Sequence, residues 1–217
     1  MKYDFTHLLW DWNGTLLDDL QLCIRLLGDL LASQGLPPVS KERYLEIFDF
    51  PISEYYQKAG FDFSKESYES LAKRYMQIYP RAGCWLGPVP GMLPVVEQLH
   101  RLGIYQGILS ASDRQILLQQ LSYSGYPEKW FREVLGLENF YGVSKVALGQ
   151  RWMEQSGISP EQVIYVGDTT HDAETAQAMG CRCILVGWGH QSVEKLEKAG
   201  VPLALTPQQL LQMLLDR

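Results

Sequence analysis

Short apolar bursts alternate along this chain with longer stretches in which apolar residues recur at helical spacing. The first burst, residues 7–12 (HLLWDW), predicts a buried strand, because strands covered on both faces are hydrophobic along their whole length. Residues 20–31 then carry an apolar side chain every three or four positions. This spacing predicts a helix that is capped by Asp18 or Asp19 and ended by Gly35.

Residues 40–80 contain no strand-like burst. They are polar and aromatic, with a helical period that Pro51, Gly60 and Pro80 interrupt. The pattern predicts several helices and no strand, and therefore a small all-helical unit inserted soon after the first strand. Its tyrosines could line a substrate pocket, but core packing at helical spacing explains most of them equally well, and we favour packing. They are Tyr44, Tyr55, Tyr56, Tyr68, Tyr75 and Tyr79.

From residue 92 onward, strand and helix patterns alternate regularly. Strands are expected at 104–109, 131–137, 163–166, 183–186 and 203–205, and helices at 93–102, 112–125, 144–156, 172–179 and 207–215. The helix after 109 is expected to open with a capping box at Ser112–Gln115. Such alternation predicts an α/β fold whose parallel sheet has helices on both faces.

Composition and charge narrow the classes of function. The formal net charge is −6, from 19 Lys and Arg against 25 Asp and Glu, so no basic surface for nucleic acid or an anionic membrane is expected. No apolar run approaches the length of a membrane span, and residues 1–7 lack a signal-peptide core, which favours a cytoplasmic protein. Of the four cysteines, Cys181 and Cys183 are close enough to share one face of a strand, where we expect them to pack. The oligomeric state cannot be predicted from this sequence.

Carboxylates follow two of the predicted strands. Asp11 ends the first burst, while Asp168 and Asp172 follow the strand at 163–166. Taken separately, Asn13-Gly14 indicates a tight turn and Asp172 a helix cap. Ligands bind at the carboxyl ends of parallel strands, and grouped carboxylates need a cation, so together they predict a Mg²⁺ site.

Two further residues suggest phosphate chemistry. Ser110 ends the strand at 104–109 beside a helix start, where a hydroxyl can contact a phosphate oxygen, although an ordinary turn serine is as good an explanation. Lys145 begins a helix, where its charge opposes the helix dipole. A site would explain this position, and so would a solvated surface.

The order of these motifs resembles that of the haloacid dehalogenase-like superfamily, and its phosphoglycolate-phosphatase-like branch in particular. Residues 11–16 (DWNGTL) resemble the first motif, 108–110 (ILS) the second, Lys145 the third and 167–172 (GDTTHD) the fourth. The resemblance implies a Rossmann-like doubly wound core at residues 1–16 and 86–217, with a helical cap domain at 17–85.

The same resemblance implies a Mg²⁺-dependent phosphatase of small phosphorylated metabolites that forms an aspartyl phosphate. The implied catalytic residues are Asp11, Asn13 and Lys145. Phosphate-binding residues are expected to be Gly14, Thr15, Ser110, Ala111 and Lys145. Mg²⁺ ligands are expected to be Asp11, the backbone carbonyl of Asn13, Asp168 and Asp172, where Asp172 orients Lys145 or a metal-bound water.

The sequence departs from the family pattern at Asn13, where phosphatases carry an acid/base aspartate, and at Val146, where the lysine motif has proline. An amide neither donates a catalytic proton nor accepts one. General acid–base catalysis contributes about 10²–10⁴-fold, so hydrolysis is expected to be slow. The alternatives are a substrate with a good leaving group, a non-hydrolytic phosphate-binding or regulatory protein, and a dehalogenase or phosphonatase. Deamidation of Asn13-Gly14 would restore the family's aspartate.

Overall fold

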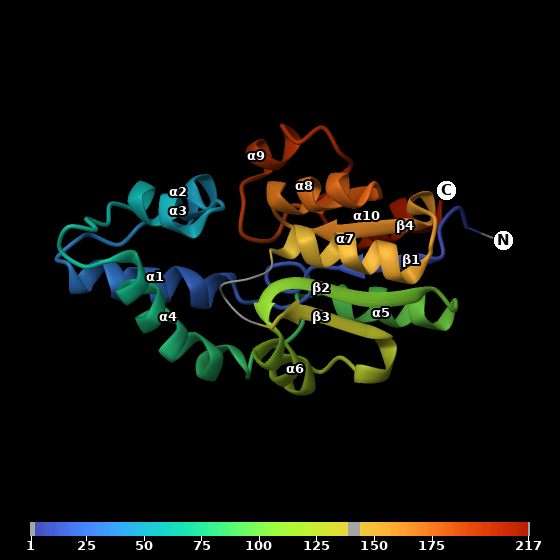
Figure 1. Ribbon diagram of the computed structural model, residues 1–217, viewed down its shortest axis with the longest axis horizontal. Coiled ribbons are helices and arrows are strands. Elements are labelled where there is room, and N and C mark those ends of the chain that lie inside the picture. The colour runs from blue at the N-terminus through green and yellow to red at the C-terminus, as the bar shows by residue number, and fades with distance from the viewer. Residues whose placement is uncertain (1–2, 139–143, 217) are drawn as a thin grey trace.

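A computed structural model describes residues 3–138 and 144–216 of the protein. Six strands form one sheet in the order β3-β2-β1-β4-β5-β6, and every neighbouring pair is parallel (Figure 1). The strands are β1 (His7–Trp10), β2 (Tyr105–Asp113), β3 (Glu133–Leu137), β4 (Val163–Gly167), β5 (Arg182–Val186) and β6 (Leu203–Ala204). This is a doubly wound sheet whose order reverses between β1 and β4, and it confirms the predicted fold class.

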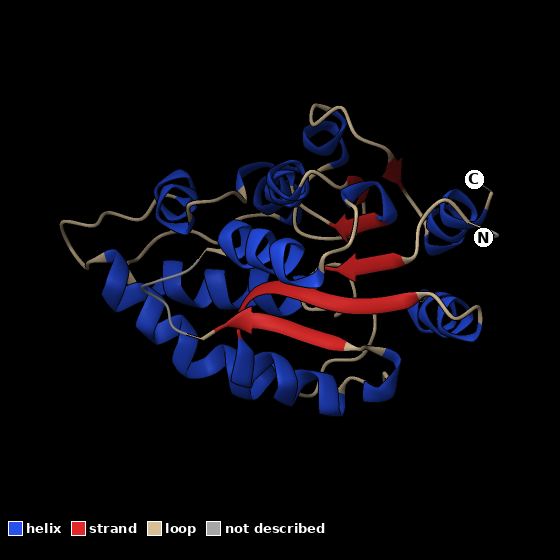
Figure 2. Ribbon diagram, turned by 45° about the vertical axis from the view of Figure 1, so that its right-hand side comes forward, coloured by secondary structure: helices blue, strands red, loops and turns tan. Residues whose placement is uncertain are grey.

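Helices cover both faces of this sheet (Figure 2). Side chains of α5 (Met92–Arg101), α6 (Arg114–Tyr123) and α10 (Pro207–Leu215) pack in one hydrophobic cluster with alternate strand residues such as Leu8 and Trp10. The opposite cluster contains Leu9 and side chains of α7 (Lys145–Ser156), α8 (Thr170–Met179) and α9 (Val193–Glu197). The alternation follows from the two-residue period of a strand.

Four helices between β1 and β2 lie to one side of the sheet (Figure 1). They are α1 (Leu20–Ser33), α2 (Lys41–Ile47), α3 (Ile52–Ala59) and α4 (Tyr68–Gly83). Their apolar faces form a hydrophobic cluster of their own, in which Tyr55 and Tyr56 are buried. We call helices α1–α4 the helical unit.

The loop after β5 joins the helical unit to the sheet. The backbone N–H of Ser192 donates to the Leu45 carbonyl, and the Gln191 side chain donates to the Phe48 carbonyl. Lys195 donates to the same Phe48 carbonyl and forms an ion pair with Asp49. The helical unit is therefore held against the core by polar contacts close to the carboxyl end of β5.

Some local predictions were wrong. β2 continues to Asp113 through an irregular register against β3, so Ser110 lies within the strand. Asp113, and not Ser112, caps α6, because its carboxylate accepts from the N–H groups of Gln115 and Ile116. Asp19 precedes α1 but makes no cap bond, since other donors occupy its carboxylate. The short α9 was not predicted.

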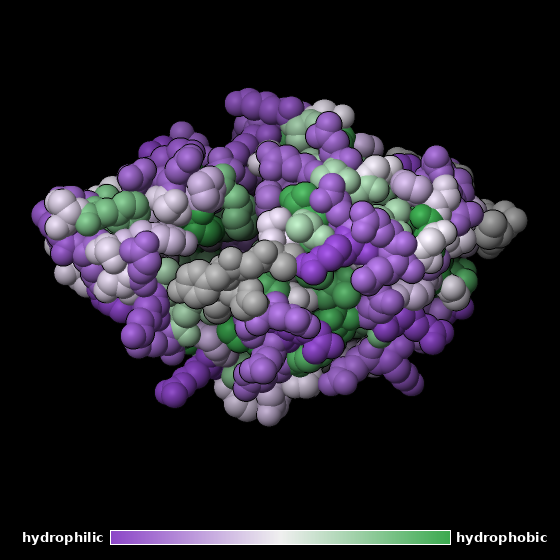
Figure 3. All heavy atoms as spheres, viewed as in Figure 1, coloured by the Kyte–Doolittle hydropathy of each residue, from purple (hydrophilic) through white to green (hydrophobic). Residues whose placement is uncertain are grey.

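Most of the face shown in Figure 3 is hydrophilic, and its hydrophobic residues form only small patches. Within the described residues, no helix is long and apolar enough to span a membrane. Most of the buried apolar side chains belong to three internal clusters, and a smaller set of polar residues is buried beside them.

Candidate active site

Buried polar residues gather at the carboxyl ends of β1 and β4, the two central strands. Asp11 directly follows β1, and its backbone N–H donates to the Val166 carbonyl of β4 at 2.8 Å. Asp168 directly follows β4, and Asp172 lies in the first turn of α8. The site therefore occupies the switch point of the sheet, where doubly wound proteins bind their ligands.

The three carboxylates form one cluster. Oxygen atoms of Asp11, Asp168 and Asp172 all lie within 4.8 Å of one another, and all three residues are buried. Burial raises the pKa of Asp11 to about 8, and the other two carboxylates add to the increase although Lys145 opposes it. Like charges at this separation need a cation among them.

Lys145 supplies part of that positive charge. Its Nζ lies 2.9 Å from Asp11 Oδ1 and 2.5 Å from Asp172 Oδ1, and its side chain is 4% exposed. Burial alone would lower the pKa of Lys145, but the two carboxylates raise it, so the lysine is charged. The lysine that the sequence placed at a helix start thus lies inside the carboxylate cluster.

Asp172 is held by donors on every side. Its Oδ2 accepts from the Thr169 backbone N–H and hydroxyl, and its Oδ1 accepts from Lys145 and from the Tyr165 hydroxyl. Although burial opposes it, these contacts lower the pKa of Asp172. Asp172 thus holds the Lys145 ammonium group beside Asp11. Its catalytic or metal-binding role stays a prediction.

Asp168 lies in a confined space. It accepts from the Thr15 hydroxyl at 3.0 Å and from the His190 backbone N–H at 2.7 Å. A Cβ on Gly14 or on Gly189 would overlap its carboxylate, and Gly14 also has a φ of +68°. Glycine is thus required at both positions. Burial raises the pKa of Asp168 to about 6.

The charge and chemistry of the cluster fit a hard divalent cation. When all three carboxylates are ionised, Lys145 neutralises only one of them, and the remaining two negative charges are buried. Oxygen donors are the ligands that Mg²⁺ prefers. Asp11 and Asp168 accept fewer hydrogen bonds than Asp172, so their oxygen atoms would hold such an ion.

The predicted phosphate-binding residues surround the same place, but several are already engaged. The Thr15 hydroxyl donates to Asp168, and the Gly14 backbone N–H donates to Asp19. Ser110 is 1% exposed, and its Oγ accepts from the Ser112 backbone N–H. Ala111 follows it in β2 and is half-buried. Their role in binding phosphate stays a prediction.

Asn13 belongs to a second network that the sequence did not predict. Its Nδ2 donates to Asp19 Oδ2 at 2.9 Å and to the Tyr79 hydroxyl, and its Oδ1 accepts from the Ser112 hydroxyl at 2.6 Å. The Tyr79 hydroxyl in turn donates to Asp19. The side chain that departs from the family pattern is therefore fixed on three sides.

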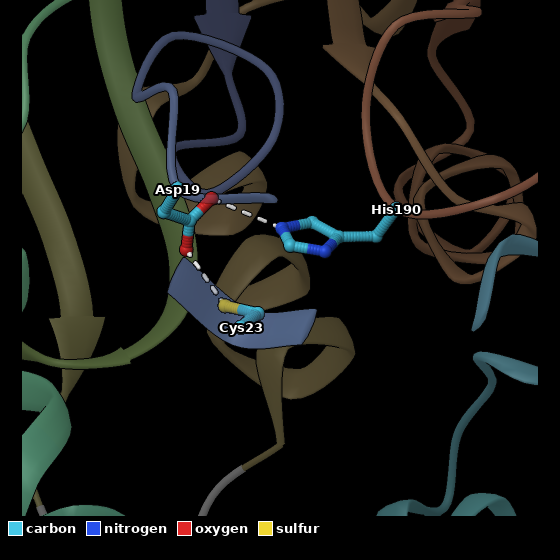
Figure 4. Close-up of side chains that lie close together, drawn as sticks. All are labelled: Asp19, Cys23 and His190. Carbon is cyan, nitrogen blue, oxygen red and sulfur yellow. Dashed lines mark hydrogen bonds and ion pairs between the residues drawn. The ribbon is translucent and has the colours of Figure 1, made fainter. Parts of the chain in front are cut away.

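His190 completes this second network (Figure 4). Its Nε2 lies 3.0 Å from Asp19 Oδ1, and its Nδ1 lies 2.9 Å from the Tyr44 hydroxyl. Burial alone would lower the pKa of His190, but the Asp19 carboxylate raises it to about 9. Burial would raise the pKa of Asp19, but the charge and hydrogen bond of His190, together with hydrogen bonds from Tyr79 and Asn13, lower it to about 2. The two form a buried ion pair.

No periodicity pointed to these residues. Asp19 was seen as a helix cap, and Tyr44 and Tyr79 as packing. The rings do lie in the hydrophobic cluster of the helical unit, while their hydroxyls reach the site. A further sequence signal is the position of His190, four residues after the strand predicted at 183–186. Asp19 and His190 are 171 residues apart, so only the fold brings them together.

The fold and the buried acidic site define the protein as a doubly wound α/β protein with its chemistry at the switch point. A family model described as "Haloacid dehalogenase-like hydrolase" matches residues 8–186. The chain belongs to this family of hydrolases, as its motifs predicted.

Curated relatives cover most of the chain. A phosphoglycolate phosphatase of Synechococcus elongatus is 25% identical, over 94% of this chain and 95% of its own length. An N-acetylmuramic acid 6-phosphate phosphatase of Pseudomonas aeruginosa is 24% identical, over 84% and 81%. The tyrosine-protein kinase PtkA of Mycobacterium tuberculosis is 24% identical, over 88% of this chain and 65% of its own.

Solved structures share the whole fold. A haloacid dehalogenase-like protein of Streptococcus pneumoniae superposes with a TM-score of 0.83 at 18% identity, covering 97% of this chain and 98% of its own. A family hydrolase of Deinococcus radiodurans, solved with bound phosphate and sodium, has a TM-score of 0.74 at 19% identity, with coverage of 99% and 96%.

Proposed function

We propose that the protein is a Mg²⁺-dependent phosphohydrolase of small phosphorylated metabolites, with Asp11 as the nucleophile. The observation that carries the proposal is the buried cluster in which Lys145 contacts both Asp11 and Asp172 beside Asp168. Phosphoryl transfer needs charge neutralisation and alignment more than it needs elaborate chemistry, and this cluster supplies both. Two of the similar proteins reported above are phosphatases by name, which supports the same class.

In the proposed reaction, an Asp11 oxygen attacks phosphorus and the bond to the leaving group breaks, which produces an aspartyl phosphate. Water then attacks the phosphorus of this intermediate and releases inorganic phosphate and free Asp11. Lys145 would neutralise the transferring oxygens, held in place by Asp172 at 2.5 Å. Thr15, Ser110 and the backbone at Gly14 and Ala111 would contact the phosphoryl group. Bound Mg²⁺ would supply further charge neutralisation for that group.

We propose residues 17–85 as a cap domain over a core of residues 1–16 and 86–217. Support comes from the separate hydrophobic cluster of the helical unit and from its polar contacts with Gln191, Ser192 and Lys195, in the loop after β5 and in α9. A cap in this position would exclude water from the site and choose the substrate.

The protein of Deinococcus radiodurans was solved with bound phosphate on the same fold, which supports a phosphorylated ligand for this site.

Asn13 restricts the leaving group that the substrate can have. Asn13 cannot protonate a departing alkoxide, so the preferred substrate is an acyl phosphate or another anhydride, whose leaving group departs without a proton. A phosphate monoester of an alcohol should react slowly for the same reason.

A second candidate function is phosphoryl transfer or phosphate-dependent binding without hydrolysis. It is favoured by the contacts of Asn13, whose two amide hydrogens are both donated to protein groups. Asn13 itself cannot act as the base that activates water against the aspartyl phosphate. A relative named as a protein kinase is consistent with transfer on this fold. A phosphonatase would need a reactive lysine in the helical unit, and this function is not favoured because the lysines there are all exposed: Lys41, Lys58, Lys65 and Lys73.

The test is Mg²⁺-dependent turnover of acetyl phosphate and p-nitrophenyl phosphate by the wild type and by Asp11→Asn. We expect the wild type to cleave acetyl phosphate faster, and Asp11→Asn to lose at least about 10²-fold of either activity. Acid-quench trapping of radiolabelled phosphate on the wild type alone would identify the intermediate. Equal rates for the two proteins would refute the assignment of Asp11, whereas trapped phosphate without turnover would favour the second candidate.

A further inference from the structure

We propose that Asp19 is a positioning residue for Asn13, and that the two form a matched acceptor–donor pair in place of an acid/base aspartate at position 13. The inference rests on the proposed function for its catalytic consequence only. The pairing itself is a statement about two side chains whose atoms lie 2.9 Å apart. It concerns the network behind the carboxylate cluster, not the cluster itself.

Asp19 accepts hydrogen bonds from every direction. Its Oδ1 accepts from the Gly14 backbone N–H at 2.9 Å and from His190, and its Oδ2 accepts from Asn13 and from the Tyr79 hydroxyl at 2.7 Å. The Cys23 thiol, one helical turn further on, also points at Oδ2 (Figure 4). Asp19 is 1% exposed, and these donors stabilise its negative charge.

A carboxylate in this state determines which way the Asn13 amide faces. Only Nδ2 can donate to Asp19, so Oδ1 must face the opposite side, where it accepts from the Ser112 hydroxyl. Both Nδ2 hydrogens are then used, by Asp19 and by Tyr79. What remains is one lone pair on Oδ1. Towards a ligand or a water, position 13 is therefore a fixed acceptor that donates nothing.

The pairing of Asn13 with Asp19 affects the variant Asn13→Asp, which would restore the family motif. Asn13→Asp alone would place a second carboxylate against Asp19 and would remove the donor that Asp19 uses. Two carboxylates at this separation repel each other strongly, and both would lose their hydrogen bond. A single substitution at position 13 should therefore not restore efficient hydrolysis.

Exchanging Asn13 and Asp19 should restore efficient hydrolysis. In Asn13→Asp/Asp19→Asn, the new amide oxygen at position 19 can keep the Oδ1 contacts with Gly14 and with His190 Nε2–H. The new amide nitrogen takes the place of Oδ2 and donates to the new carboxylate at position 13. The donors and acceptors match again, with the carboxylate now at the place where the family has it.

The experiment compares the wild type with Asn13→Asp, Asp19→Asn and the exchange. Thermal unfolding in EDTA reports the pairing, and kcat and KM for acetyl phosphate and p-nitrophenyl phosphate with Mg²⁺ report its catalytic effect. Asn13→Asp combined with Asp18→Asn is the matched control, because Asp18 is the exposed neighbour of Asp19.

We expect each single variant to lower the unfolding midpoint by about 4–10 °C, and the exchange to lower it by clearly less than the sum of the two single effects. The exchange restores the hydrogen bond between positions 13 and 19 but not the ion pair of Asp19 with His190, so part of the loss stays. For hydrolysis, Asn13→Asp should gain less than about tenfold in kcat, the exchange about 10²-fold or more, and KM should change little. The control with Asp18→Asn should behave like Asn13→Asp alone.

Additive effects of the two single variants on the unfolding midpoint would overturn the pairing. So would a gain in kcat for Asn13→Asp alone that equals the gain of the exchange. If none of the proteins hydrolyses either substrate, the proposed function fails. The midpoints then still decide the pairing, since they need no activity.

Discussion

Removing the positive charge of Lys145 should be the most damaging single change to the site. Lys145→Met keeps the length of the side chain but leaves Asp11, Asp168 and Asp172 without a cationic partner within the cluster. Breaking a buried ion pair by deleting one partner costs about 3–5 kcal/mol. Lys145 is 4% exposed and contacts two carboxylates, so water offers no substitute and the cost should lie in this range.

For a chain of this length, that loss lowers the midpoint of thermal unfolding by about 6–20 °C. The assay is tryptophan fluorescence in EDTA, using the six tryptophans of the protein as reporters. Lys198→Met is the control, because Lys198 is exposed and should shift the midpoint by less than about 2 °C. Millimolar Mg²⁺ should recover part of the stability of Lys145→Met, since it brings positive charge to the same carboxylates.

A loss below about 1 kcal/mol for Lys145→Met would refute this reasoning, because a lysine that neutralises buried carboxylates cannot be removed so cheaply. A loss that Mg²⁺ leaves unchanged would show that the carboxylates do not share one ion.

Three further predictions concern the surroundings of the cluster. Gly14→Ala should abolish turnover and lower the unfolding midpoint, because its Cβ would overlap Asp168 and His190. Gly35 also has a positive φ but has open space around it, so Gly35→Ala should cost only about 1–2 kcal/mol of backbone strain in urea unfolding. In EDTA, stability should fall as the pH rises from 6 to 9, because the folded protein holds protons on Asp11 (pKa about 8) and His190 (pKa about 9) that the unfolded chain has released; a rise over this range would contradict both assignments. Tyr44→Phe removes the hydroxyl that contacts His190 Nδ1 and should cost about 0.5–1.5 kcal/mol in the same unfolding assay, with an unchanged value indicating that the bond contributes nothing.

The sheet was predictable because its signal is local. Buried strands such as β1 and β4 are continuous apolar runs, and the residues that end them are adjacent in sequence to the runs themselves. The placement of Asp11 and Asp168 at one edge followed from the rule that parallel strands end together. The predicted cap of α6 was wrong because two candidate residues, Ser112 and Asp113, are adjacent. Pairing with β3 extends β2 as far as Asp113, so the cap lies one residue later than predicted.

The network around Asn13 was not predictable because each of its members has an ordinary local explanation. An aspartate before a helix indicates a cap, and a tyrosine at helical spacing indicates packing. What makes these residues different is a partner that only the folded chain brings close. Asp19 meets His190 of the loop after β5, and Tyr79 of α4 meets Asp19. Asn13 meets Ser112 of β2. The chemical roles of the cluster residues remain predictions that the proposed assays test.

The contact between Asp19 and the backbone of Gly14 also bears on how the protein ages. An asparagine followed by glycine deamidates when the backbone nitrogen of the glycine attacks the side-chain carbonyl carbon. In this protein, that nitrogen donates its hydrogen to Asp19 Oδ1 and to the Leu17 carbonyl, while the Asn13 amide is held by Asp19, Tyr79 and Ser112. Neither reacting group is free to turn towards the other. Folding thus protects a chemically fragile dipeptide, and Asn13 should persist as an amide for as long as the chain stays folded.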